Sequence, residues 1–308
     1  MWDDDLRKLH NSWKDIQIEH TEEPIYHYTS RIGLDGILKN RQLWANDIYI
    51  QNDKSEGIYV LGVLEQNIDS FGIQEHYKNA ILKQMEKAKV ALQDRSYEYL
   101  KHRSFIISFS TAGDELTLWN HYTKNENSVG YNIAFDTKEL MRKIKIKKLV
   151  LDNDTNVCYP GIMDVNFHHG KVIYNEHEQC EIMKEEIEKF AGYFVPNDDF
   201  CQYLLVEKIL WIGNFFKSSY FKHEQEYRLV FFTGTDKEYP DAKEIAMEIE
   251  GAKNKNHIEV YYNPYSVLSV TCSPTNKLED VEYAKKFMTS IYPNFKNVNE
   301  SKIPFRII

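Results

Sequence analysis

Cysteine is scarce in this sequence, and no two cysteines are closely spaced. The chain of 308 residues contains four cysteines and no C-x-x-C pair. This spacing argues against the common zinc signatures and against a dense disulfide framework. We expect four reduced thiols, mostly buried: Cys158, Cys180, Cys201 and Cys272.

Several nucleotide-binding and catalytic motifs are also missing. The sequence has no G-x-G-x-x-G and no G-x-x-x-x-G-K-[ST], so the usual Rossmann and P-loop signatures are absent. It has neither the G-x-S-x-G of α/β-hydrolases nor the H-E-x-x-H of zinc proteases. His168, His169 and His177 come nearest to a metal cluster, but adjacent histidines on a strand point to opposite faces. We therefore expect these histidines in a solvated loop and expect no metal.

Long apolar runs are absent as well. No segment approaches the roughly 20 apolar residues that are needed to cross a bilayer as a helix. The first five residues, MWDDD, are acidic and do not lead into the apolar stretch of a signal peptide. The sequence therefore predicts a cytoplasmic protein that does not interact with a membrane.

Composition favours a folded chain without a broad basic surface. The net charge is −9, which argues against an extended footprint on duplex nucleic acid but not against a short local groove. Aromatic residues make up 14% of the chain, with 21 tyrosines against 5 tryptophans. Tyrosine suits clefts that hold planar ligands. The excess of tyrosine could also reflect a compositional bias of the source, and both explanations stay open.

The order of predicted elements indicates the fold class. Helical and strand patterns interleave without a regular βαβ rhythm, which predicts an α+β fold rather than a doubly wound sheet. We expect one domain over residues 1–308, with an N-terminal arm or helix at 1–22 and a helical insertion at 57–102. A C-terminal helix and tail are predicted over 278–308.

Two short strand-like motifs could carry chemistry. In His27-Tyr28-Thr29, the histidine and the threonine share one strand face and Tyr28 takes the other. A histidine beside a hydroxyl can bind a polar ligand, although a hydrogen-bonded core histidine is the commoner case. Ser108 and Ser110 likewise place two hydroxyls on one face of a strand.

Two further motifs combine aromatic and charged residues. Trp119 and Tyr122 share a face of a predicted short helix and could wall a pocket or fill the core. Glu224, Glu226 and Arg228 would lie on one strand face next to an apolar run. Charges in that setting are costly to bury unpaired. They are either a salt bridge on the sheet or a catalytic carboxylate held by its neighbours.

Together these motifs form an ordered series that resembles a known family. The order is H-Y-T, then N-D-x-x-E at Asn52, Asp53 and Glu56, then S-F-S, L-W-x-H-Y and E-x-E-Y-R. Over about residues 25–272 it is similar to a large bacterial family known only as a domain of unknown function. More distantly, the series resembles ADP-ribosyltransferases of the His-Tyr-Glu type, including toxins that modify nucleic acid.

The second resemblance implies a mostly antiparallel sheet core with peripheral helices, and NAD as co-substrate without a metal. It implies that Glu226 is the catalytic glutamate, that Glu224 positions the acceptor and that Tyr122 stacks on nicotinamide. Residues expected to contact NAD are His27, Tyr28, Thr29, Ser108, Ser110, Trp119 and Arg228. The acceptor would be nucleic acid or protein, with a possible antitoxin partner. The resemblance assigns no role to Asn52, Asp53 or Glu56.

Two other functions remain open from the sequence. The scaffold could be a non-catalytic nucleotide-binding or sensor module in which Glu224, Glu226 and Arg228 form a structural ion cluster. It could also be an NAD glycohydrolase that uses water as acceptor. The transferase hypothesis needs His27, Tyr122 and Glu226 to converge on an open cleft. It fails with these residue roles if His27 and Glu226 lie on opposite sides of the sheet.

Overall fold

The structure is a computed structural model that describes residues 2–12, 16, 18–48, 56–93, 102–122, 129–152, 157–196, 198–234, 257–293 and 295–304. Its strands are β1 Ile25–Ser30, β2 Gln42–Asp47, β3 His102–Ser110, β4 Gly130–Phe135, β5 Lys145–Asp152, β6 Val157–Asp164, β7 His168–Lys171, β8 Glu226–Gly234, β9 His257–Tyr261, β10 Val267–Cys272 and β11 Val298–Glu300. Its α-helices are α1 Trp2–Asn11, α2 Arg31–Asn40, α3 Tyr59–Asn67, α4 Glu75–Gln93, α5 Leu116–Tyr122, α6 Thr137–Met141, α7 Glu176–Ala191, α8 Phe200–Gly213 and α10 Leu278–Ile291. The 3-10 helices within the described ranges are η2 Ile68–Phe71, η3 Ser219–Glu224 and η4 Pro264–Ser266.

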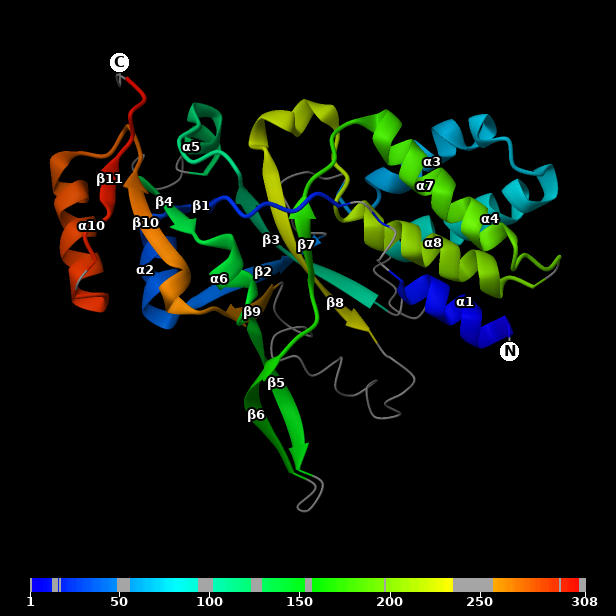
Figure 1. Cartoon of the computed structure of the whole chain (residues 1–308), viewed down its shortest axis with the longest axis horizontal. Helices are drawn as coiled ribbons and strands as arrows, with labels where there is room; N and C mark the ends of the chain where they lie inside the picture. The colour runs from blue at the N-terminus through cyan, green and yellow to red at the C-terminus, as the bar shows by residue number, and fades with distance from the viewer. Residues whose placement is uncertain are drawn as a thin grey trace.

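The strands form one mixed and mostly antiparallel sheet, as expected for an α+β fold (Figure 1). The order is β11-β10-β4-β1-β3-β2-β9-β5-β6, and β8 pairs with both β3 and β7 outside this path. The pairing of β10 with β11 is parallel, and the other strand pairings are antiparallel. The predicted fold class is confirmed.

The sheet splits along one edge of β3. The other edge pairs with β8 along the whole strand, from His102 to Ser110. On the split edge, β1 pairs only where Tyr26 meets Ser110, and β2 pairs only near Ile106. Two half-sheets therefore diverge from β3, with α2 as the connection between β1 and β2.

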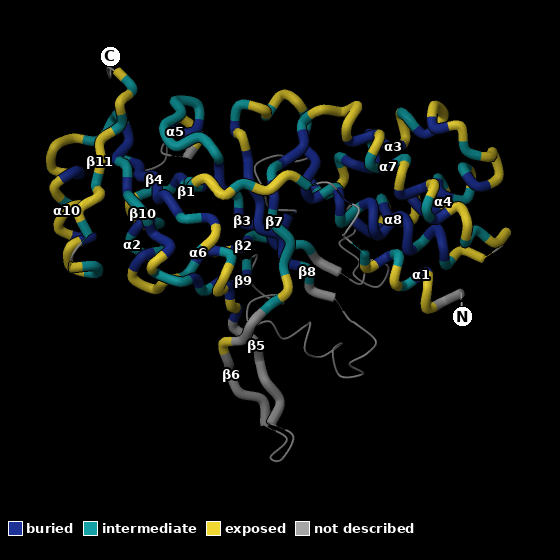
Figure 2. The backbone as a smooth tube through the Cα atoms, viewed as in Figure 1, coloured by how far each residue is buried: buried dark blue, intermediate teal, exposed yellow. Residues whose placement is uncertain are grey.

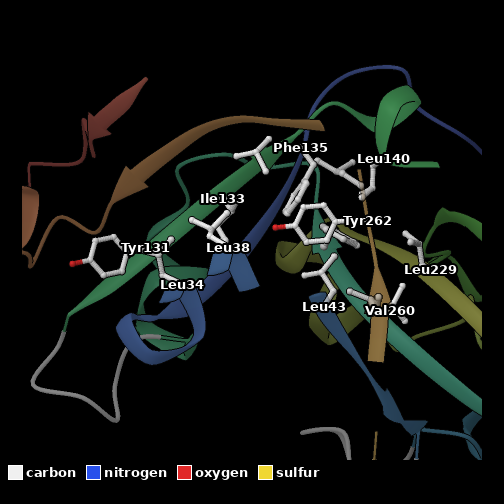
Figure 3. Packing of buried hydrophobic residues seen from close by; sticks show 14 of the residues in the cluster. Leu34, Leu38, Leu43, Tyr131, Ile133, Phe135, Leu140, Leu229, Val260 and Tyr262 are labelled. Atoms are coloured by element: carbon white, nitrogen blue, oxygen red, sulfur yellow. The ribbon is translucent and has the colours of Figure 1, made fainter. Parts of the chain in front are cut away.

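The main apolar core fills the space between these half-sheets and helices α2 and α10. Figure 3 shows Leu34 and Leu38 of α2 packed beside Tyr131 and Ile133 of β4. Ser30 begins α2 as its N-cap, because its hydroxyl accepts a hydrogen bond from the backbone N–H of Gly33 at 3.2 Å.

A second apolar core lies in a bundle of helices at one end of the sheet (Figure 1). Helix α8 packs against α1, α3, α4 and α7. Helices α3 and α4, which account for the helical segment predicted at 57–102, thus share a core with segments from elsewhere in the chain. Figure 2 shows buried positions alternating with exposed ones along these helices, as amphipathic helices require.

One local prediction was wrong. His168 and His169 do not lie in a solvated loop, because β7 pairs them with Val230 and Leu229 of β8. Burial lowers the pKa of each histidine to about 4.

The described ranges contain neither a membrane-spanning helix nor a cluster of metal ligands. Within those ranges, no helix is long and apolar enough to span a membrane. Nor do the same ranges contain a group of three or more histidine, cysteine, aspartate or glutamate side chains that could hold a metal ion. Three of the cysteines, Cys180, Cys201 and Cys272, are buried free thiols, whereas Cys158 lies where side chains are not described.

Candidate functional site

Three of the predicted motifs lie on neighbouring strands. In the centre of the sheet, β8 pairs with β3, which in turn pairs with β1. Tyr26, Ser110 and Glu226 stand opposite one another across these strands. Ser108 stands opposite Arg228 one step along the same face. The sheet therefore brings the H-Y-T, S-F-S and E-x-E-Y-R segments to one place.

Glu226 is the centre of a buried ionic network. Its side chain is 4% exposed. Ser108 Oγ donates to Glu226 Oε1 at 2.6 Å, and Arg228 Nε donates to the same oxygen at 2.7 Å. Glu226 Oε2 accepts from Arg228 Nη2 at 2.9 Å and from Lys217 Nζ at 3.1 Å. Four hydrogen bonds therefore fix the position and the plane of this carboxylate.

Arg228 ties the network to the helical bundle. Glu226 and Arg228 are two residues apart on β8, so both side chains project from the same face and pair in bidentate geometry. The guanidinium also donates from Nη1 to the carbonyl of Asn214 at 2.6 Å and from Nη2 to Glu56 Oε1. Glu56, for which the sequence gave no role, thus belongs to the site. Asn52 and Asp53, the other residues of that motif, lie outside the described residues.

Lys217 is the second cation of the network and was not predicted. Its Nζ lies 2.7 Å from Glu224 Oε2, 3.1 Å from Glu226 Oε2 and 3.4 Å from Glu56 Oε1. Glu224 does not share the strand face of Glu226, because it belongs to η3. Gln225, with φ of 44°, turns the chain before β8 begins. The Glu224 carboxylate nevertheless reaches the network through Lys217.

The network contains three carboxylates and two cations, all buried. Burial opposes the charge on Glu226, but Arg228 and Lys217 outweigh it and lower its pKa to about 2. At Glu56, burial is the largest effect and raises the pKa. Glu226 is thus ionised at neutral pH, and Glu56 is the carboxyl group that binds a proton more readily than usual.

His27 reaches this network through the main chain. Its Nδ1 donates to the carbonyl oxygen of Ser108 at 3.0 Å, where the split leaves that edge of β3 without a strand partner. Its ring contacts Phe109, with centroids 5.5 Å apart, and burial lowers its pKa. The register places His27 in the row of Phe109 and Tyr227, on the opposite face from Ser108 and Glu226. The requirement that His27 and Glu226 share one side of the sheet is therefore not met.

Thr29 follows His27 on the same face and packs against the start of α2. A Cβ on Gly33 would lie 2.0 Å from Thr29 Oγ1, so the close approach of helix and strand depends on this glycine. The structure does not bring Thr29 to the network. It lies against the first turn of the helix and pairs with Tyr131 of β4.

Tyr28 and Trp119 form a separate aromatic cluster beneath α5. Their rings meet edge to face, with centroids 4.7 Å apart. Tyr28 OH donates to the Ala112 carbonyl at 2.9 Å, and Trp119 Nε1 donates to Asp114 at 2.8 Å. Trp119 is 2% exposed, which makes it a core residue rather than an open wall. Tyr122 ends α5, and its side chain lies outside the described part of the structure.

Ser110 links the strand to the segment that precedes β8. Its Oγ donates to the carbonyl of Glu224 at 2.7 Å and accepts from the backbone N–H of Ala112 at 3.0 Å. The side chain is buried. Ser110 therefore holds η3 against β3, whereas Ser108 contacts the central carboxylate itself.

Further polar groups beside the network were also missed by the sequence analysis. Tyr174 OH accepts from the backbone N–H of Glu226 at 3.0 Å. His223 packs against His121 of α5, with ring centroids 5.9 Å apart. Its Nε2 is buried and has no hydrogen-bond partner among the described residues. The only advance signal for Lys217 is a single lysine directly after an apolar segment.

The site is thus a buried, net acidic network at the centre of a split antiparallel sheet. The profile of a family described as "Protein of unknown function (DUF2971)" matches residues 118–229 of this chain. This segment contains Lys217, Glu224, Glu226 and Arg228, whereas His27 and Ser108 lie before it. The predicted similarity to a family of unknown function is confirmed over this range. Neither the curated proteins nor the solved structures give a match.

Proposed function

We propose a revised form of the transferase hypothesis, in which the protein is a NAD-dependent ADP-ribosyltransferase whose central carboxylate is Glu226. His27 lies on the opposite face of the sheet and cannot take the role first given to it, so Tyr26 takes its place. The observation that carries the proposal is the position of Ser108 between two of the motifs. Its hydroxyl binds Glu226 and its carbonyl binds His27. The three motif-bearing strands thus meet at a single residue, as a site assembled from all three requires.

The chemistry of the reaction fits the electrostatics of the network. Cleavage of the bond between nicotinamide and ribose develops positive charge on the ribose, as in glycoside hydrolysis. A fixed and ionised carboxylate stabilises that charge best in a dry, preorganised site. Glu226 is ionised at neutral pH and held by four hydrogen bonds. With three carboxylates against two cations, the network also favours a positively charged partner.

The roles of several residues change in this proposal. His27 positions β3 through the Ser108 carbonyl instead of contacting the ribose beside Glu226. Tyr26 shares the face of Glu226 and is half-buried, so it replaces His27 as the ligand contact from β1. Glu224, held by Lys217, handles the acceptor. A nucleic-acid or protein acceptor, an antitoxin partner and action in the cytoplasm belong to the same proposal.

One observation favours a second candidate, a non-catalytic nucleotide-binding or sensor module. The hydrogen bonds from Ser108, Lys217 and Arg228 occupy both oxygens of Glu226. A carboxylate in this state holds β8 to its neighbours without contacting a substrate. Under this alternative the protein binds NAD and does not cleave it.

The two candidates separate when the protein is incubated with NAD labelled in the adenosine part and with cell lysate. The transferase releases nicotinamide and transfers label to nucleic acid or protein. Free ADP-ribose without labelled acceptor indicates a glycohydrolase, and binding without nicotinamide release indicates the sensor module. Glu226→Gln should lower nicotinamide release about 100-fold or more, the usual effect of removing an electrostatic group of this kind.

Two variants control for damage to the fold. Glu224→Gln changes the same network but should keep nicotinamide release while losing transfer. Glu186→Gln removes a buried carboxylate that binds Lys208 in the helical bundle, far from Glu226 in the sequence, and should keep both activities. Nicotinamide release by Glu226→Gln at the wild-type rate would contradict the catalytic assignment. Thermal unfolding of each variant verifies that it is folded.

A further inference from the structure

A stacked pair of rings lies on β2 and β9, outside the ionic network around Glu226. Trp44 of β2 lies against His257 of β9, with ring centroids 4.1 Å apart and planes 14° apart. Trp44 is 58% exposed although it lies within a paired strand. An exposed indole backed by an imidazole is a flat, rigid surface for another planar ring.

The cross-strand register shows on which side of the indole another ring could lie. Along β2 and β9 the facing pairs are Asn46 with His257, Trp44 with Glu259, and Gln42 with Tyr261. Trp44 leans toward the first pair, because it stacks on His257. The side chain of Glu259 extends toward the third pair.

Two hydrogen bonds fix this direction. Glu259 Oε2 accepts from Gln42 Nε2 at 3.3 Å and from Tyr261 OH at 3.4 Å. The indole face that His257 does not cover and the Glu259 carboxylate therefore lie on the same side of Trp44.

The pairing of a stacking surface with a carboxylate selects among planar ligands. A carboxylate accepts hydrogen bonds and cannot donate them, and it is strongest with two parallel donors. Guanine has two adjacent donors on one edge, N1–H and the 2-amino group. Adenine has a single amino donor there, beside a ring nitrogen that would face the carboxylate with its lone pair. We propose that β2 and β9 form a binding site for a guanine base, stacked on Trp44 and hydrogen-bonded to Glu259. The guanine donors replace the long contacts of Gln42 and Tyr261 to Glu259 Oε2.

The position of this site relative to the ionic network follows from the strand pairing. Asn46 pairs with Ile106, so Trp44 shares the sheet face of Ser108 and Glu226. Lys145 of β5 pairs with Tyr261 and places a positive charge on the side where the phosphate of a guanine nucleotide could lie. The guanine site depends only on β2, β9 and β5, and it stands whether or not Glu226 is catalytic.

Titration with guanosine 5′-monophosphate tests the site without any assay of activity. We expect the nucleotide to quench tryptophan fluorescence, and calorimetry to give its affinity. Trp44→Ala should weaken binding about tenfold or more, since stacking on one aromatic ring contributes that much to single-base binding. Trp44→Phe should keep most of the affinity. Because Trp44 is exposed, both variants should fold, which far-ultraviolet circular dichroism verifies.

Specificity is the sharper part of the test. Inosine 5′-monophosphate keeps N1–H and lacks the 2-amino group, so it should bind about tenfold more weakly than the guanine nucleotide. Glu259→Gln should shift the preference toward adenosine 5′-monophosphate, because an amide pairs with adenine. Tyr265→Ala removes an aromatic ring that is 87% exposed on η4 and serves as the control without effect.

Three results would overturn the proposal: no binding of the guanine nucleotide, unchanged binding by Trp44→Ala, or equal binding of the three nucleotides. None of these results bears on nicotinamide release, so failure of this site and failure of the proposed transferase remain distinguishable. Loss of nicotinamide release in Glu226→Gln with intact guanine binding would in turn show that the two sites act separately.

Discussion

Lys217 holds three buried carboxylates, and its removal tests whether the network is coupled as the distances indicate. In Lys217→Met the ammonium within 2.7 to 3.4 Å of Glu224, Glu226 and Glu56 is lost, while the apolar stem is kept. The remaining cation is Arg228, which binds Glu226 and Glu56. Among the described residues, three buried carboxylates would then face one guanidinium.

The expected loss of stability in Lys217→Met follows from the breaking of a buried ion pair. Removing one partner of such a pair typically costs about 3–5 kcal/mol, because the other charge is left buried and uncompensated. A carboxyl group in the variant should reduce this cost by binding a proton, which removes its negative charge. Glu56 is the first candidate, since burial already raises its pKa above the ordinary 4.5. When the pKa of a carboxyl group rises by one further unit, its protonated form gains about 1.4 kcal/mol relative to the ionised form.

The sign of the pH dependence is then fixed. A carboxyl group whose pKa is higher in the folded state than in the unfolded state binds its proton more tightly when folded. The stability it contributes is present at low pH and is lost as the pH rises through the folded pKa. Lys217→Met should therefore be destabilised most near pH 8 and should recover part of the lost stability near pH 5.

Urea unfolding at pH 5 and pH 8 measures both quantities. The double variant Lys217→Met with Glu56→Gln should recover stability at pH 8, because the amide removes one excess charge. Lys189→Met is the matched control, since Lys189 binds Glu186 in the bundle and is more exposed than Lys217. A loss below about 1 kcal/mol, or an equal loss at both pH values, would refute the assignment of a coupled buried network.

Three further predictions follow from the same structure. Ser30→Ala removes the cap of α2 and should lower the free energy of unfolding by about 1 kcal/mol, whereas Ser30→Asp should not. With its pKa near 2, Glu226 should contribute stability that is lost as the pH falls from about 4.5 to 2, and acid titration of Glu226→Gln should lack this loss. Asp114→Ala should free the C-terminal segment and speed its proteolysis, since Asp114 accepts from Trp119, Ser301 and the backbone N–H of Lys302; an unchanged cleavage rate would contradict this.

Local periodicity was enough to place many elements from the sequence. The strand-like motifs at His27 and Ser108 lie on β1 and β3, the short helix predicted around Trp119 is α5, and the C-terminal helix predicted from residue 278 is α10. These segments carry their own signals in strand-forming residues or in helical spacing of apolar residues. The α+β class followed from the order of such segments, because no tertiary contact is needed to see that order.

The network itself could be predicted only in part. Glu226 and Arg228 are two residues apart on one strand, so their pairing follows from strand geometry. Glu56 and Arg228 are separated by 172 positions, and no local pattern relates them. Glu224 was misplaced because Gln225 takes a left-handed conformation, which a non-glycine residue rarely adopts.

For His27-Tyr28-Thr29, the sequence reveals the motif but not which of its side chains lie on the same sheet face as Glu226. Alternation within β1 correctly separates Tyr28 from its two neighbours, but the sequence does not say which face meets Glu226. That choice is set by β3, where Ser110 pairs with Tyr26 on one side and with Glu226 on the other. A shift of one residue in this pairing would exchange the faces and bring His27 to the carboxylate. The function of the motif therefore depends on the register of two strand pairs, and His27 acts on the network through the backbone of Ser108.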